Sequence, residues 1–140
     1  MKGYSYFLDT NIFFRIIVKD DRRKAAACEN LIKTISEGKI KAISSSLVLA
    51  ELVWTSLRVY KISKPEIIKI IQGILAIKNL KIDDRPNPLL AVEYFEKHKV
   101  KFIDCLIASH PQIKERNIKV ISYDKDFDKL GIIRLEPESI

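Results

Sequence analysis

The chain has 140 residues, of which 47% are hydrophobic, so it is long and apolar enough to fold around a sizeable core. That composition excludes an intrinsically disordered chain, and no apolar run reaches the roughly 18 residues that a membrane-spanning helix requires. Lysine and arginine number 25 against 18 aspartates and glutamates, and this net charge of +7 attracts polyanions without by itself establishing nucleic-acid binding.

Short apolar runs alternate with segments whose apolar residues recur at helical spacing. In chain order we predict a strand at 4–8, helices at 12–18 and 23–37, a strand at 40–44, helices from 45 or 46 through 57 and at 66–78, a strand at 80–83, helices at 88–99 and 103–115, a strand at 119–122, a helical turn at 125–130 and a strand at 132–135. Strands that alternate with helices predict an α/β fold whose parallel sheet is covered on both faces.

Local signals support several of these boundaries. Ser63, Pro65 and Glu66 form a capping box with proline in the first turn of a helix. Pro111 is expected to kink or split the helix at 103–115, because proline lacks a backbone N–H and clashes with the preceding turn.

The two cysteines indicate a reducing compartment. Cys28 and Cys105 each lie in an apolar segment with helical spacing. We interpret both as buried free thiols rather than as a disulfide framework. With no recognisable targeting signal, this predicts a cytoplasmic protein. No repeat or low-complexity linker divides the chain, so we expect one domain over residues 1–140.

Four acidic residues have access to one edge of the predicted sheet. Asp9 ends the first strand and Asp124 follows the fourth, and the carboxyl ends of parallel strands meet at the same edge. Asp104 opens a helix. Glu51 lies in an apolar helix, where an acid is unfavourable to bury unless it is paired or bound to a cation. Oxygen ligands of this kind select Mg²⁺ or Mn²⁺ over softer metals.

Each acid taken alone also has a structural interpretation. Asp9 and Asp104 could be N-caps of the helices that follow them. Glu51 could face solvent from its helix, and Asp124 and Asp126 could be loop acids that balance neighbouring lysines. The functional interpretation therefore depends on the joint arrangement of the acids.

Four segments that contain these acids resemble the PIN-domain family, and within it the VapC-type toxins of toxin–antitoxin pairs. The segments, in the family's order and over nearly the whole chain, are Phe7–Asn11, Ser46–Glu51, Phe102–Ala108 and Val120–Phe127. The resemblance implies a three-layer α/β/α sandwich with a central parallel sheet. It also implies a Mg²⁺-dependent endoribonuclease, a phosphodiester hydrolase that acts on RNA as the toxin of a type II pair.

The resemblance also assigns residues. One acid from each segment matches the family's catalytic and metal-binding quartet: Asp9, Glu51, Asp104 and Asp124. Asp126 matches an additional metal-binding acid of some members, and Asn11 and Ser122 match polar positions that orient the acids. One departure is His110-Pro111, which interrupts a helix that the family usually continues.

Basic residues surround the acidic segments. When the five matched acids are set aside, 13 acids face 25 bases, so the rest of the molecule carries an excess of 12 positive charges. An acidic cluster within a basic surface suits RNA binding, because the basic surface attracts the phosphate backbone and the acids can hold a metal. Six bases flank the acidic segments and are candidate RNA contacts, each with a solvated surface role as its alternative: Arg15, Lys19, Arg22, Arg23, Lys125 and Lys129.

The helix at 66–78 is apolar around more of its circumference than one buried face requires, and the preceding helix adds Trp54, Leu57, Val59 and Tyr60. This pattern predicts a homodimer with a partner-binding surface, and the alternative is a deeply buried helix in a monomer. The expected partners are thus an RNA substrate, a cognate antitoxin protein and a second copy of the chain, with no membrane.

Four other functions compete with this interpretation. A metal-free ribonuclease would need a histidine pair, for which His98 and His110 are the only candidates. A receiver-type phosphoacceptor would need adjacent acids after the first strand, and Asp9 is followed by threonine and asparagine. A housekeeping RNA-processing PIN nuclease and a non-catalytic PIN-like RNA- or protein-binding module are further alternatives, and retention of all four acids argues against the latter.

Overall fold

Five short parallel strands form the centre of the computed structural model, which describes residues 3–140. Every pair of neighbouring strands is parallel. The strand order across the sheet is β3-β2-β1-β4-β5. The strands are β1 (Tyr4–Leu8), β2 (Lys41–Ser44), β3 (Leu80–Ile82), β4 (Lys119–Ile121) and β5 (Arg134–Leu135).

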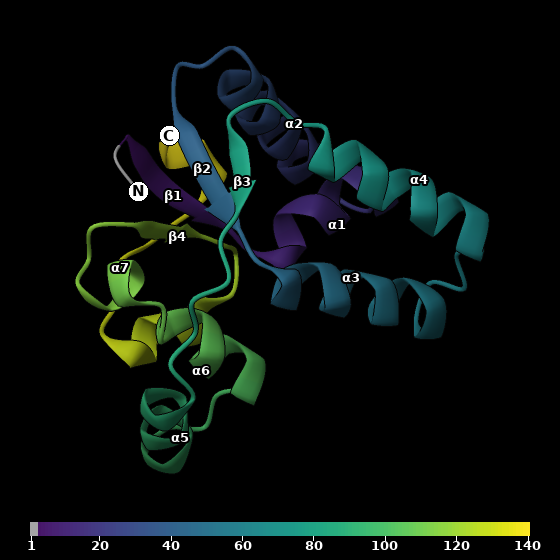
Figure 1. Cartoon of the computed structure of the whole chain (residues 1–140). Helices are drawn as coiled ribbons and strands as arrows, with labels where there is room; N and C mark the ends of the chain where they lie inside the picture. The colour runs from purple at the N-terminus through teal and green to yellow at the C-terminus, as the bar shows by residue number, and fades with distance from the viewer. Residues whose placement is uncertain (1–2) are drawn as a thin grey trace.

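Helices cover both faces of this sheet, as Figure 1 shows. One face carries α1 (Thr10–Val18), α2 (Arg22–Ser36), α3 (Ser46–Arg58) and α4 (Lys64–Leu75). The other carries α5 (Pro88–Lys97), α6 (Phe102–Ala108) and α7 (Pro111–Lys114). The short 3₁₀ segments η1 (Lys125–Leu130) and η2 (Pro137–Ser139) complete the chain. The predicted three-layer α/β/α sandwich is confirmed.

The order of the strands explains the two helical layers. The chain moves from β1 through β2 to β3 in one direction, then crosses back to β4 on the other side of β1. Right-handed crossovers in opposite directions place their helices on opposite faces of a sheet. The direction therefore reverses between β1 and β4, and α/β proteins hold their ligands at the carboxyl ends of such strands.

Two helix boundaries lie where the local sequence signals predict them, at the start of α4 and at Pro111. The hydroxyl of Ser63 accepts the Glu66 N–H at the start of α4. Pro111 splits its helix as predicted, since it occupies the first turn of α7 and the residue before it, His110, has an extended backbone. Two predicted ends are wrong. Helix α4 ends at Leu75 rather than at residue 78, and α5 ends at Lys97 rather than at residue 99.

Buried strand residues make the core continuous from one helical layer to the other. Phe7, Leu8 and Ile43 are fully buried, as strands covered on both faces require. The two cysteines, Cys28 and Cys105, are buried free thiols, as predicted. Among the described residues, no helix is long and apolar enough to cross a membrane.

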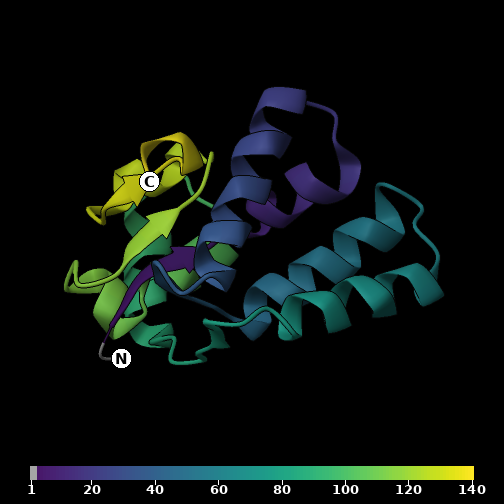
Figure 2. The same cartoon turned by 90° about the horizontal axis from the view of Figure 1, so that it is seen from above.

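Helices α3 and α4 form a pair that projects beyond the sheet (Figures 1 and 2). On α4, only Ile67 and Ile74 are buried, whereas Ile68 and Leu75 are exposed. Trp54 on α3 is 60% exposed. The alternative of a deeply buried helix is therefore wrong within this chain, and the pair leaves apolar side chains in solvent.

Candidate active site

An open pocket of about 190 Å³ lies where the chain leaves β1 and β4. All four acids of the expected quartet border it, each from a different segment of the chain. Its lining residues are Asp9, Thr10, Asn11, Phe14, Glu51, Thr55, Lys101, Asp104 and Asp124.

Asp9 and Asp124 cap helical segments and border the pocket at the same time. Asp9 accepts the Thr10 N–H at 2.8 Å, and Asp124 accepts the Asp126 N–H at 2.9 Å. Both residues follow a strand and open a helical segment, so their backbones are fixed by the sheet on one side and by the cap on the other. The N-cap interpretation is therefore right for Asp9, and it coexists with a place in the pocket.

Asn11 and Ser122 hold the two strand ends together. The Ser122 hydroxyl donates to Asp9 Oδ2 at 2.6 Å and accepts the Asp124 N–H at 3.0 Å. The Asn11 amide donates to Ser122 Oγ at 2.9 Å and to Asp9 Oδ2 at 3.2 Å. Its oxygen accepts the Tyr123 N–H. These bonds orient Asp9 and tie it to the backbone of Asp124.

Asp104 is a buried carboxylate that lacks a full set of hydrogen-bond partners. It is 2% exposed, and its Oδ2 makes no hydrogen bond with the described residues. Its interpretation as an N-cap is wrong, because Lys101 occupies the cap position of α6 and Asp104 lies in the first turn. Burial, followed by the nearby charge of Asp9, raises the pKa of Asp104 to about 8.

Asp9 is also a buried carboxylate, whereas Glu51 is partly exposed. Burial raises the pKa of Asp9 to about 6, against the lowering effect of its hydrogen bonds from Ser122 and Thr10. Glu51 is 22% exposed and borders the pocket from α3, so it does not simply face solvent as the structural alternative held.

Lys101 is a charged residue of the pocket that was not among the predicted site residues. Its ammonium lies 3.9 Å from the Glu51 carboxylate. Although burial lowers the pKa of Lys101, the charges of Asp104 and Glu51 raise it overall. The available signal was its place immediately before the segment that contains Asp104. Lys101 offsets part of the negative charge while most of its side chain faces solvent.

Asp126 is not brought into the pocket. Its carboxylate pairs with Lys129 at 3.1 Å, and it supplies only its backbone N–H to Asp124. Within residues 3–140, no three His, Cys, Asp or Glu side chains are close enough to one another to hold a metal ion as they stand. The four acids thus border one open pocket, but no three of them are close enough to share one metal ion as they stand.

None of the six candidate RNA contacts lines the acidic pocket. Arg15 pairs with Asp20, Lys19 with Glu29, and Lys129 with Asp126. Three more are exposed: Arg22, Arg23 and Lys125.

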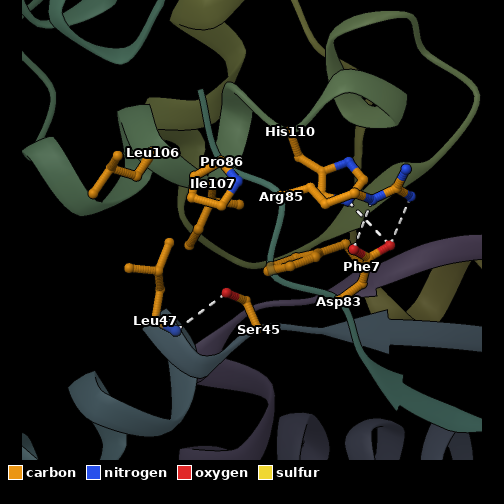
Figure 3. A pocket seen from close by; sticks show the side chains of 9 residues that line it. All are labelled: Phe7, Ser45, Leu47, Asp83, Arg85, Pro86, Leu106, Ile107 and His110. Carbon is orange, nitrogen blue, oxygen red and sulfur yellow. Dashed lines mark hydrogen bonds and ion pairs between the residues drawn. The ribbon is translucent and has the colours of Figure 1, made fainter. Parts of the chain in front are cut away.

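A separate cluster, in which Asp83 and His110 are buried and Arg85 is exposed, joins β3 to the α6–α7 junction (Figure 3). Arg85 donates two hydrogen bonds of 2.9 Å to the Asp83 carboxylate, and His110 Nε2 lies 3.3 Å from it. The cavity beside the cluster measures about 10 Å³, which is barely room for one water. The two histidines form no catalytic pair at the acidic pocket, since neither His110 nor His98 borders it. The cluster is a structural junction.

Comparison with known proteins identifies a family and several similar structures. A model of the PIN domain matches residues 6–133. The fold is similar to VapBC2 from Rickettsia felis bound to a DNA fragment from their promoter, with 25% identity, a TM-score of 0.68, and 94% of this chain and 97% of that one covered. It is similar to FitAcB from Neisseria gonorrhoeae, with 18% identity, a TM-score of 0.64, and 96% and 99% covered. It is also similar to VapC20 from Mycobacterium tuberculosis, a sarcin-ricin loop cleaving toxin, with 15% identity, a TM-score of 0.61, and 92% and 97% covered. No curated protein matches the sequence.

Proposed function

The chain belongs to the PIN-domain family, and we propose on that footing that it is a Mg²⁺-dependent endoribonuclease, the toxin of a type II toxin–antitoxin pair. The observation that carries the proposal is the convergence of four acids on one open pocket at the ends of β1 and β4. Asp9, Glu51, Asp104 and Asp124 are the proposed catalytic and metal-binding residues. Asp126 acts, on this proposal, through its backbone N–H, which donates to the Asp124 carboxylate.

The donor chemistry of the pocket suits a hard divalent cation. All four donors are carboxylates, and oxygen donors suit Mg²⁺ or Mn²⁺. Asp104 has a buried oxygen without a hydrogen-bond partner among the described residues, and burial together with the charge of Asp9 raises its pKa. We propose that Asp9 and Asp104 are the central ligands and that the quartet draws together on binding. The bound ion would neutralise phosphate charge and lower the pKa of its water.

The protein's own groups prepare the site for phosphodiester hydrolysis. Ser122 and Asn11 hold the Asp9 side chain in one orientation, so this side chain loses little conformational freedom when substrate binds. Asp104 retains a proton near neutral pH in the metal-free protein, since its pKa is about 8. The exposed ammonium of Lys101 stands beside Glu51 and can contact a substrate phosphate. Attack by water leaves 5′-phosphate and 3′-hydroxyl ends and does not use the 2′-hydroxyl.

The test is cleavage of single-stranded and loop-containing RNA with Mg²⁺ or Mn²⁺, and with EDTA. Activity should require the metal and should disappear in Asp104→Asn. The matched control is Asp128→Asn, which changes an exposed acid that pairs with Arg134 outside the pocket. Full activity in EDTA would contradict the proposal, and absence of any cleavage with metal would favour a non-catalytic binding module.

The partner proposed for the toxin is an antitoxin protein. Helices α1, α2 and α4 enclose an apolar hollow of about 200 Å³, lined by Phe13, Ile16, Ile17, Ile32, Ile70, Gly73, Ile74 and Ile77. The similarity to VapBC2, whose structure holds a DNA fragment from their promoter, supports a paired system. A small DNA-binding protein encoded immediately upstream should co-purify with this chain and relieve its toxicity. Growth that is unaffected by expression would instead favour a housekeeping nuclease.

We also propose a homodimer through the projecting α3–α4 pair, where Trp54 and Leu75 are exposed. Residues 1–140 would act as one nuclease domain. We propose the cytoplasm as its location, because Cys28 and Cys105 are buried free thiols.

A further inference from the structure

A second hollow of about 190 Å³ adjoins the acidic pocket. It is lined by Asn11, Phe14, Arg15, Val18, Asp20 and Tyr60. Asn11 and Phe14 border both spaces, so the two hollows are neighbours that share these residues as a wall. A strand bound over the acidic pocket therefore has this hollow beside it.

Two aromatic rings form one wall of the second hollow. Phe14 on α1 and Tyr60, which follows α3, have ring centroids 5.3 Å apart and planes tilted by 38°. Tyr60 is 42% exposed, so part of its ring is open to a ligand. Tyr60 therefore contributes to this hollow rather than to the outward apolar face of the α3–α4 pair. An open aromatic face is a stacking platform for a nucleic-acid base.

Arg15 is the basic residue that lines this hollow, and its ion-pair partner Asp20 lines it too. The Arg15 guanidinium lies 3.2 Å from the Asp20 carboxylate and 5.6 Å from the centre of the Tyr123 ring. These two contacts orient Arg15, and the Asp20 side chain is 57% exposed, so their ion pair is not shielded from solvent. A planar guanidinium in a fixed place suits a phosphate oxygen or a base edge.

We propose that this hollow binds one unpaired base of the RNA strand next to the cleaved phosphate. The base stacks on Tyr60, and Arg15 contacts the adjoining phosphate. The inference rests on the proposed ribonuclease function and adds a base-binding subsite to it, because only an unpaired base is free to enter. The protein should therefore bind single-stranded segments or loops and reject continuous duplex.

The experiment measures RNA binding in EDTA, so that cleavage is not involved. The probe is a short single-stranded RNA that carries the fluorescent base 2-aminopurine, titrated against wild type, Tyr60→Ala, Tyr60→Phe and Arg15→Gln. Phe95→Ala is the matched control, because Phe95 is an exposed ring that also packs against another ring, Phe102, and borders neither hollow. Melting temperatures verify that each variant is folded.

Tyr60→Ala should weaken binding roughly fivefold to a hundredfold and should abolish quenching of the stacked base, as stacking energies of about 1–3 kcal/mol imply. Tyr60→Phe and Phe95→Ala should bind like wild type, and Arg15→Gln should weaken binding and reduce its salt dependence. Equal binding by Tyr60→Ala and wild type, or no binding by wild type, overturns the inference. Tyr60-dependent binding without metal-dependent cleavage keeps the inference and rejects the nuclease function.

Discussion

Asp104→Asn should stabilise the metal-free protein while it destroys activity. Asparagine keeps the shape of the side chain and removes the charge that burial and Asp9 disfavour. A carboxyl whose pKa is raised on folding favours the protonated state in the folded protein. Ionisation of Asp104 therefore lowers the free energy of unfolding. This loss of stability is absent below pH 3.8 and increases with pH up to the folded-state pKa of about 8.

The magnitude follows from those two values. The pKa of Asp104 rises from 3.8 to about 8, and neutral pH lies roughly three units above the lower value. Each unit corresponds to about 1.4 kcal/mol, so the variant should gain on the order of 4 kcal/mol at neutral pH. For a domain of this size that corresponds to a melting temperature higher by on the order of 10 °C.

Calorimetry of both proteins in EDTA between pH 4 and pH 8 measures the difference. The advantage of Asp104→Asn should be small at pH 4 and should increase towards pH 8. Excess Mg²⁺ should stabilise wild type more than the variant, since binding to the folded state adds stability. The control Asp128→Asn loses an ion pair with Arg134 and should melt no higher than wild type. An Asp104→Asn protein that melts no higher than wild type at any pH refutes the reasoning.

Three further predictions follow from other contacts. Ser122→Ala removes the 2.6 Å hydrogen bond to Asp9. It should slow metal-dependent RNA cleavage roughly tenfold to a hundredfold without changing the fold. Single-turnover rates measure this effect, and an unchanged rate would exclude an orienting role for Ser122. Burial lowers the pKa of His110 below 6.5, so the folded protein resists protonation and loses stability as pH falls below that value. In His110→Gln this part of the pH dependence should vanish from urea unfolding curves, and an identical slope would contradict it. Light scattering at micromolar concentration should show a dimer of twice the 16.2 kDa chain mass, and Trp54→Glu should yield monomer; a monomeric wild type would exclude the dimer.

The sequence alone determined the layered α/β fold, because hydrophobic periodicity, helix-capping residues and helix-breaking prolines act over a few residues. The capping box at Ser63 and the break at Pro111 are local effects of this kind. The sequence also indicated that Asp9 and Asp124 would meet, since parallel strands end at a shared edge. Resemblance to the PIN-domain family then brought Glu51 and Asp104 into the same set.

Only the tertiary structure decided how these groups interact. Asp104 is buried with an unpartnered oxygen, and Lys101 approaches Glu51, because the tertiary structure brings the start of α6 to the pocket that α3 also borders. The place of the Phe14–Tyr60 wall beside the acidic pocket likewise depends on α1 meeting the end of α3. Burial and charge pairing are set by neighbours from distant parts of the chain, and a local pattern carries no information about which neighbours those are.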